Sequence, residues 1–122
     1  MVTFIVEGWS DHDAIKRAYP QESVSTVVLN GTKFNNSIKA QIDKAMEEGD
    51  TYLLSDPDTA GDQIEEVVCG WYSGIERIRP DPLKARFLRL GKGYKYGIEY
   101  CSVAYLKELL GRYVDESEGM SS

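Results

Sequence analysis

The most informative segment of the chain is Thr51-Tyr-Leu-Leu-Ser-Asp-Pro-Asp-Thr-Ala-Gly-Asp62. The short apolar run at its start predicts a buried strand, and two aspartates, Asp56 and Asp58, follow the end of that strand. Thr59 and Asp62 have the spacing of a capping box, and apolar residues at helical spacing continue from them. The stretch therefore predicts a strand, an acidic turn and a helix. In an open α/β sheet, ligands bind beyond the carboxyl ends of the strands, where this turn lies.

Asp56 and Asp58 are candidate metal ligands. Two carboxylates held this close repel one another, and a divalent cation relieves that repulsion. Oxygen ligands of this kind suit Mg²⁺, with Mn²⁺ as the other candidate. Pro57 between them fixes one backbone angle and stiffens the turn. The alternative is a helix cap next to an ordinary acidic turn, and the D-x-D pattern alone does not decide between the two.

Length and composition indicate one domain without a membrane span. The chain has 122 residues, and we expect a single domain over residues 1–114 followed by a polar tail over residues 115–122. It contains no apolar run of membrane-spanning length, and its N-terminus lacks a signal sequence, so we expect a cytoplasmic protein. Cys69 and Cys101 lack metal-ligand spacing and are expected to be core or half-buried thiols.

The charge distribution is asymmetric. The formal net charge is −6, but the segment from Arg77 to Lys95 carries seven cations against Asp81, which gives it +6 and leaves −12 for the remainder. Such a segment indicates either a surface for a polyanion or a solvated edge strand and loop.

The other segments continue the alternation of strand and helix. The patterns predict strands over 2–6 and 25–29 and a basic strand over 85–90 at the edge of the sheet. Helices are predicted from a Ser10–Asp13 capping box to Pro20, from Asn35 or Asn36 to Gly49, from Thr59 to about Trp71, and from Ser102 to Gly111. Gly74, Pro80 and Pro82 predict an irregular connection before the basic strand. We therefore expect an α/β fold, an open, Rossmann-like sheet of about four mainly parallel strands with helices on both faces.

Basic and aromatic residues gather in the second half of the chain. Residues 91–97 predict a flexible loop that combines glycines, cations and stacking surfaces, a combination typical of sites for single-stranded nucleic acid. The candidate nucleic-acid-binding residues are Lys92, Lys95, Arg86, Arg89 and Tyr94. His12 is expected to be an exposed histidine of a first helical turn rather than a catalytic base.

Two motifs resemble those of Toprim domains, the metal-binding catalytic modules of topoisomerases, bacterial primases and related nucleases. Ile5-Val6-Glu7-Gly8 is similar to the glutamate motif of the first Toprim strand, and Asp56-Pro57-Asp58-Thr59-Ala60-Gly61 matches the D-x-D-x-x-G motif. Within that superfamily the chain is most similar to the catalytic domain of ribonuclease M5, which matures 5S ribosomal RNA, and to its small stand-alone relatives. The residues that carry this resemblance are Glu7 to Asp11, Asn30-Gly31, Asp56 to Asp58, Gly91 to Gly93 and Gly97 to Glu99.

The resemblance implies a Mg²⁺-dependent nuclease that cleaves phosphodiester bonds of structured RNA or DNA, with RNA favoured. Asp56 and Asp58 would hold the metal together with Glu7, which would also act as general acid or base. Glu99 and Asp11 would be further ligands or would support the ligands, and Lys92 and Lys95 would clamp phosphate. Ribonuclease M5 carries an additional C-terminal region, so a protein partner is a candidate source of substrate recognition for this chain.

Two alternatives stay open. In the first, the chain is a non-catalytic Toprim adaptor that binds nucleic acid and needs a partner. In the second, Asp56-Pro57-Asp58 belongs to a phosphatase of the haloacid dehalogenase type, although Ala60 stands where that family's pattern has Thr or Val. Replacing Glu7 by Gln separates the nuclease from the adaptor, because only the nuclease has turnover to lose.

Overall fold

The computed structural model describes residues 1–30 and 34–120, with side chains through Glu116. Its main sheet has four strands in the order β2-β1-β3-β4, and all three neighbouring pairs are parallel. The strands are β1 (Val2–Val6), β2 (Val24–Val28), β3 (Asp50–Leu54) and β4 (Glu76–Ile78). The predicted open α/β sheet is therefore confirmed.

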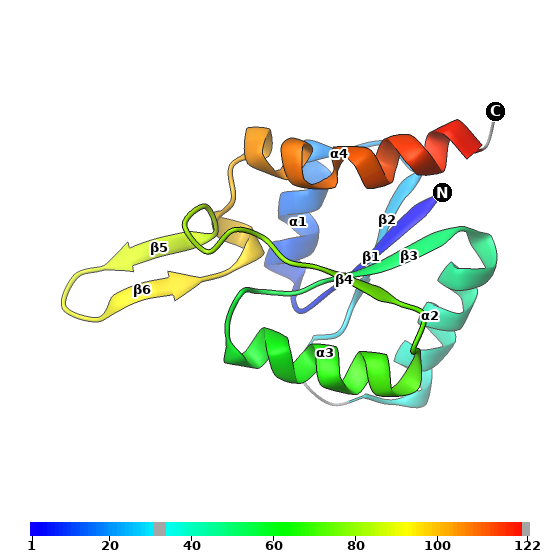
Figure 1. Cartoon of the computed structure of the whole chain (residues 1–122), viewed down its shortest axis with the longest axis horizontal. Helices are drawn as coiled ribbons and strands as arrows, with labels where there is room; N and C mark the ends of the chain where they lie inside the picture. The colour runs from blue at the N-terminus through cyan, green and yellow to red at the C-terminus, as the bar shows by residue number, and fades with distance from the viewer. Residues whose placement is uncertain (31–33, 121–122) are drawn as a thin grey trace.

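Two helices cover each face of the sheet (Figure 1). The helices α1 (Trp9–Ala18) and α4 (Val103–Met120) lie on one face, and α2 (Asn36–Glu48) and α3 (Thr59–Trp71) lie on the other. Successive residues of β1 alternate between two cores, because side chains of a strand point to opposite faces. Phe4 and Val6 pack with residues of α1 and α4, whereas Ile5 packs with residues of α2 and α3. All of β1 is buried, as its continuous apolar pattern predicts.

The fourth strand of the sheet comes from a segment that was predicted to be irregular. β4 has only three residues, between Gly74 and Pro80, and so short a strand shows no periodicity in the sequence. The prediction that residues 85–90 form an edge strand of the main sheet is wrong. β5 (Arg86–Arg89) pairs instead with β6 (Gly93–Tyr96) in a separate antiparallel hairpin.

The hairpin also replaces the flexible loop predicted over residues 91–97. Gly91 and Gly93 both have φ of +74°, a backbone conformation that glycine adopts without strain, and this allows the tight connection between β5 and β6. The hairpin projects from the body of the molecule, and the short 3₁₀ helix η1 (Ile98–Tyr100) follows it (Figure 1).

Two predicted helix starts and one predicted helix end are wrong. The N-caps of α1 and α3 are Gly8 and Asp58, rather than Ser10 and Thr59. The last helix does not stop at Gly111, because it continues to Met120 and buries Val114 one turn further on. Residues 115–120, which were expected to lie in a polar tail, thus have a helical backbone. The division of the chain at residue 114 stays a prediction.

Other helix ends agree with the sequence. Asn35 caps α2 by accepting a hydrogen bond from the Ile38 amide at 2.9 Å, and Gly49 follows its last turn. Ser102 caps α4 by accepting one from the Tyr105 amide at 3.0 Å. Among the described helices, none has the length and apolar character needed to cross a membrane.

Candidate functional site

Three carboxylates gather at the carboxyl edge of the sheet. Glu7, Asp11 and Asp56 each offer an oxygen, and these oxygens all lie within 4.8 Å of one another. Glu7 directly follows β1, Asp56 follows the neighbouring strand β3, and Asp11 lies in the first turn of α1. Because β1 and β3 are parallel and paired from Val2–Asp50 to Ile5–Leu53, their carboxyl ends meet at one place. We call these three residues the acidic group.

Backbone amides orient two members of the acidic group. The Gly8 amide donates a hydrogen bond to Asp11 Oδ2 at 3.1 Å, and the Ile98 amide donates one to Asp56 Oδ1 at 2.9 Å. The second bond links η1, which follows the hairpin, to the turn after β3. The acidic group therefore has fixed side chains rather than freely rotating ones.

Arg77 and Gly61 fix the backbone of the turn that carries Asp56. The Arg77 guanidinium donates a hydrogen bond to the Asp56 carbonyl oxygen at 2.9 Å, and its side chain is only 2% exposed. A Cβ at Gly61 would overlap that same carbonyl oxygen. The glycine of the D-x-D-x-x-G motif is thus required because helix α3 starts against the backbone of Asp56.

Burial and mutual repulsion perturb the acidic group. Burial is the largest cause that raises the pKa of Glu7 from 4.5 to about 9, followed by its hydrogen bond to Asp56 and the negative charges of Asp56, Asp58 and Asp11. Burial, followed by the charge of Asp56, raises the pKa of Asp11 to about 6, although amide hydrogen bonds from Gly8 and Glu99 oppose this rise. Without a compensating cation, Glu7 therefore retains its proton at neutral pH.

The acidic group fits a hard divalent cation. Glu7 Oε1 is buried and has no hydrogen-bond partner among the described residues, so one carboxylate oxygen is left without a donor. Ionised carboxylates accept hydrogen bonds but donate none, and oxygen-rich sites of this type suit Mg²⁺, Mn²⁺ or Ca²⁺. A cation would both satisfy Glu7 Oε1 and relieve the repulsion that raises its pKa.

Asp58, which was predicted as a metal ligand, occupies a different position. Its Oδ1 accepts a hydrogen bond from the Gly61 amide at 2.8 Å, so the carboxylate caps α3. It lies outside the acidic group, although its charge contributes to the raised pKa of Glu7. Asp58 thus caps α3, whereas Asp56 belongs to the acidic group, and the metal-ligand roles of both residues stay predictions.

Glu99 and Asp11 were predicted to be further ligands or supporting residues. Asp11 is buried and belongs to the acidic group itself. Glu99 lies in η1, half-buried, where its amide and its charge both act on Asp11. Sequence analysis missed Arg77 and the Ile98 amide, since an amide hydrogen bond across the fold leaves no signal in side-chain patterns.

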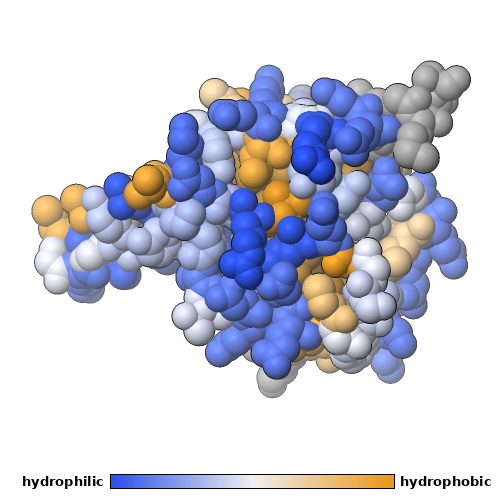
Figure 2. All heavy atoms as spheres, in the orientation of Figure 1, coloured by the Kyte–Doolittle hydropathy of each residue, from blue (hydrophilic) through white to orange (hydrophobic). Residues whose placement is uncertain are grey.

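The predicted nucleic-acid-binding residues all lie on the projecting hairpin, where hydrophilic and hydrophobic residues gather side by side (Figure 2). Within the described chain, none of the hairpin cations forms an ion pair, and the Arg86 guanidinium lies over the Tyr94 ring at 4.1 Å. The cations concerned are Arg86, Arg89, Lys92 and Lys95. Arg77 and Arg79 of the same basic segment instead pair with Asp62 and Glu65 of α3. Among the described residues, Arg77 and Arg79 of the basic segment thus form ion pairs with acids, whereas the cations of the hairpin form none.

His12, Cys69 and Cys101 are not members of the acidic group. His12 is half-buried rather than exposed, with Nδ1 at 2.6 Å from Thr26 Oγ1, because α1 packs on β2. Cys69 is half-buried and Cys101 is buried, and both are free thiols.

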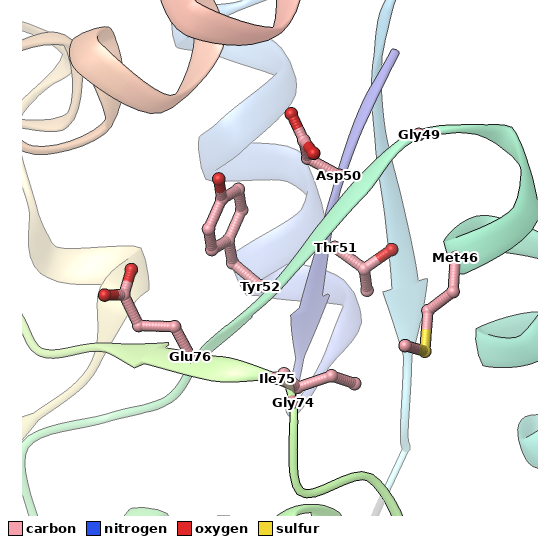
Figure 3. A pocket seen from close by; sticks show the side chains of 8 residues that line it. All are labelled: Met46, Gly49, Asp50, Thr51, Tyr52, Gly74, Ile75 and Glu76. Carbon is pink, nitrogen blue, oxygen red and sulfur yellow. The ribbon is translucent and has the colours of Figure 1, made fainter.

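A pocket opens at the opposite edge of the sheet (Figure 3). It lies at the amino ends of β3 and β4 and is lined by Met46, Gly49, Asp50, Thr51, Tyr52, Gly74, Ile75 and Glu76. None of these residues belongs to the acidic group. Because ligands of open α/β sheets bind at the carboxyl edge, the acidic group is the better candidate site.

Comparison with known proteins finds several relatives named ribonuclease M5. The chain is 29% identical over 106 residues to ribonuclease M5 of Staphylococcus aureus, which covers 87% of this chain and 56% of the relative. It is 32% identical over 75 residues to ribonuclease M5 of Clostridium acetobutylicum, covering 62% of this chain and 39% of the relative. Ribonuclease M5 of Bacillus cereus is 26% identical over 114 residues, covering 93% and 57%. The chain thus spans less than two thirds of the length of these relatives, and no family model matches it.

Proposed function

We propose that this chain, a Toprim-type protein similar to ribonuclease M5, is a metal-dependent nuclease that cleaves RNA. The observation that carries the proposal is the acidic group, in which three carboxylates meet at the carboxyl edge of the sheet and Glu7 Oε1 lacks a partner among the described residues. The similarity to several ribonuclease M5 proteins supports RNA as the substrate. The unpaired cations of the hairpin supply a surface for its phosphates.

Glu7, Asp11 and Asp56 would hold the cation, with Mg²⁺ favoured and Mn²⁺ as the other candidate. When bound, such an ion supplies charge neutralisation at the phosphate and lowers the pKa of a water. The Ile98 amide and the Arg77 guanidinium keep Asp56 in place, so this ligand is oriented before any cation arrives. Asp58 would contribute negative charge and a rigid start of α3 through Oδ1. Its Oδ2 does not take part in the cap bond.

Glu7 is the candidate general acid or base. Its raised pKa means that the carboxyl can hold a proton at neutral pH, and a cation nearby would shift it toward the ionised form. A group whose proton affinity responds in this way can donate a proton to a leaving oxygen or accept one from water. Glu99, half-buried beside Asp11, would tune the acidic group through its charge.

The proposal is tested by cleavage of labelled RNA with and without Mg²⁺. The similarity to ribonuclease M5 makes a precursor of 5S ribosomal RNA the first substrate, accompanied by unrelated structured RNA, single-stranded RNA and DNA. Glu7→Gln and Asp56→Asn should abolish cleavage, whereas Asp13→Asn, an exposed acid of α1, should keep it.

The results separate the nuclease from the adaptor. Metal-dependent cleavage that both site variants lose supports the nuclease. RNA binding without any cleavage, unchanged in Glu7→Gln, supports a nucleic-acid-binding adaptor that needs a partner. An absence of both cleavage and binding refutes an RNA-directed function for the chain alone.

A further inference from the structure

We propose that one face of the β5–β6 hairpin, formed by Phe87, Arg89 and Lys95, binds an unpaired RNA base and its flanking phosphates. The chain would then act on RNA that has single-stranded nucleotides next to the cleaved bond. We call this surface the Phe87 face. The inference rests on the proposed function in so far as it concerns cleavage, whereas the binding itself can be measured separately.

The pairing of the hairpin defines its two faces. Phe87 lies directly opposite Lys95, and residues directly opposite one another point to the same side. Arg89 lies two positions beyond Phe87 and therefore shares its face. Leu88 and its partner Tyr94 point to the other side. The hairpin thus has two chemically different faces within one small element.

The aromatic ring of Phe87 is supported from behind. It stacks on Tyr100 with a centroid distance of 5.5 Å and an interplanar angle of 22°. Tyr100 in turn packs against the backbone of Gly97, where a Cβ would approach the ring to 3.3 Å. Phe87 is nevertheless 55% exposed. A fixed ring with one open face is the arrangement on which single-stranded bases stack.

Of the other two aromatic side chains of the hairpin, Tyr96 is half-buried and the ring of Tyr94 is covered on one face. The Arg86 guanidinium lies 4.1 Å from the centre of the Tyr94 ring, so one face of that ring carries a cation of the protein itself. Both rings thus have one covered face, but Phe87 is 55% exposed and Tyr94 42%, so Phe87 offers more free ring surface. Phe87 is therefore the residue to which we assign base stacking.

Charge favours RNA over an apolar protein surface as the occupant of the Phe87 face. In the part of the chain that the structure describes, the side chains of Arg89 and Lys95 form no hydrogen bond or ion pair. The segment 83–98 contains no acidic residue. Two unpaired cations beside an exposed aromatic ring match a base with a phosphate on either side.

The hairpin that carries the Phe87 face is tied to the acidic group by backbone hydrogen bonds. The Gly97 amide donates to the Ala85 carbonyl at 2.9 Å and closes the base of the hairpin. The next amide, that of Ile98, donates to Asp56 Oδ1 at 2.9 Å. A nucleotide stacked on Phe87 would therefore be held by an element anchored on the acidic group. Bases inside a duplex hide their faces, so this arrangement selects unpaired nucleotides.

The test is binding of fluorescent RNA in EDTA, where cleavage does not interfere. A short single-stranded RNA and the blunt duplex of the same sequence are titrated with the wild type and with Phe87→Ala. Leu88→Ala is the matched control, since Leu88 is 56% exposed and points to the opposite face. Phe87→Ala should weaken binding of the single strand by about 5-fold to 100-fold, the effect of losing one stacked base. Leu88→Ala should stay within about twofold of the wild type.

Two further variants check the chemistry. Phe87→Trp keeps a stacking surface and should retain binding of the single strand, which also guards against a folding defect in Phe87→Ala. Arg89→Gln should lower the slope of log K against log salt by about 0.7, the value for one phosphate contact of a single strand.

The outcomes separate this inference from the proposed function. Equal effects of Phe87→Ala and Leu88→Ala, or equal binding of duplex and single strand, overturn the inference even if the wild type cleaves RNA. Selective loss of single-strand binding in Phe87→Ala supports the inference even if no RNA is cleaved. In that case only the proposed nuclease activity is refuted. If no RNA binds at all, the Phe87 face is not an RNA site, and a protein partner becomes its candidate occupant.

Discussion

Glu7→Gln should stabilise the protein when no divalent cation is present. The folded protein raises the pKa of Glu7 from 4.5 to about 9, so it binds more protons than the unfolded chain between these two values. Stability therefore falls as the pH rises through this window, because folding must either retain a proton or bury a charge. Gln is neutral at every pH and can still donate a hydrogen bond to Asp56, so the variant escapes this cost.

The magnitude follows from the size of the shift. Near pH 7.5, three pH units above the unfolded pKa, the part of the shift that has taken effect corresponds to a ceiling of about 4 kcal/mol. Because Asp11 and Asp56 share the repulsion and water reaches the half-buried Glu7, we expect a gain of about 1–2 kcal/mol. For a chain of this size, that corresponds to a rise in Tm of about 3–8 °C.

The assay is thermal unfolding in EDTA at about pH 5 and about pH 8, repeated with Mg²⁺. Glu7→Gln should exceed the wild type in Tm at the higher pH and match it more closely at the lower pH. Mg²⁺ should stabilise the wild type through binding to the folded state and should have little effect on the variant. Asp13→Asn is the charge-matched control on α1, and its exposed side chain should leave the Tm nearly unchanged. A variant that is less stable than the wild type at the higher pH, or equally shifted at both values, would refute this account of Glu7.

Three further predictions concern the turn between β3 and α3. Gly61→Ala should lower the free energy of unfolding, measured by chemical denaturation, by about 3 kcal/mol or more, because its Cβ would overlap the Asp56 carbonyl oxygen. Gly70→Ala in the same helix is the control. It has open space around its Cβ and should raise the free energy of unfolding by about 0.5–1 kcal/mol. Arg77→Ala should lower the free energy of unfolding by about 2–3 kcal/mol, since it removes a buried guanidinium from two carboxylates and a carbonyl. Arg79→Ala should lower it by less than about 1 kcal/mol, because the Arg79 side chain is 61% exposed. Asp58→Asn should keep stability within about 0.5 kcal/mol, because Asn caps helices as well as Asp; if Mg²⁺ still stabilises this variant as it does the wild type, Asp58 is a cap and not a ligand.

The sequence predicts the elements whose pattern is long enough to be recognised. The strands that became β1, β2 and β3 are apolar runs bounded by turns, and their parallel order places Glu7 beside Asp56 without further information. β4 was not predicted, because two of its three residues are charged, the exposed Glu76 and the ion-paired Arg77. The hairpin was predicted as an edge strand followed by a loop. Glycines occur both in flexible loops and in the tight turns of hairpins, so Gly91 and Gly93 do not distinguish the two in the sequence.

The position of Asp58 shows why a motif does not fix the role of each of its residues. D-x-D places two carboxylates in one turn, but the helix that follows has unsatisfied amides at its start, and the carboxylate just before α3 is the nearest acceptor. Asp56, two residues earlier, has its carbonyl fixed by Arg77 and its carboxylate turned toward the Ile98 amide and Glu7. Asp11, predicted as a further ligand or a supporting residue, then completes the acidic group from α1.

The distribution of charge follows from the same division. A chain with a net charge of −6 repels RNA as a whole, and the acidic group adds to that repulsion until a cation binds. The cations that could offset it are unequally available, since those near α3 are already paired with its acids, whereas those of the hairpin are not. RNA should therefore contact the hairpin first and reach the acidic group only where a cation compensates the carboxylates. On this reasoning, Mg²⁺ should strengthen RNA binding by the wild type but not by Glu7→Gln, and equal strengthening of both would show that the ion acts on the RNA rather than at the acidic group.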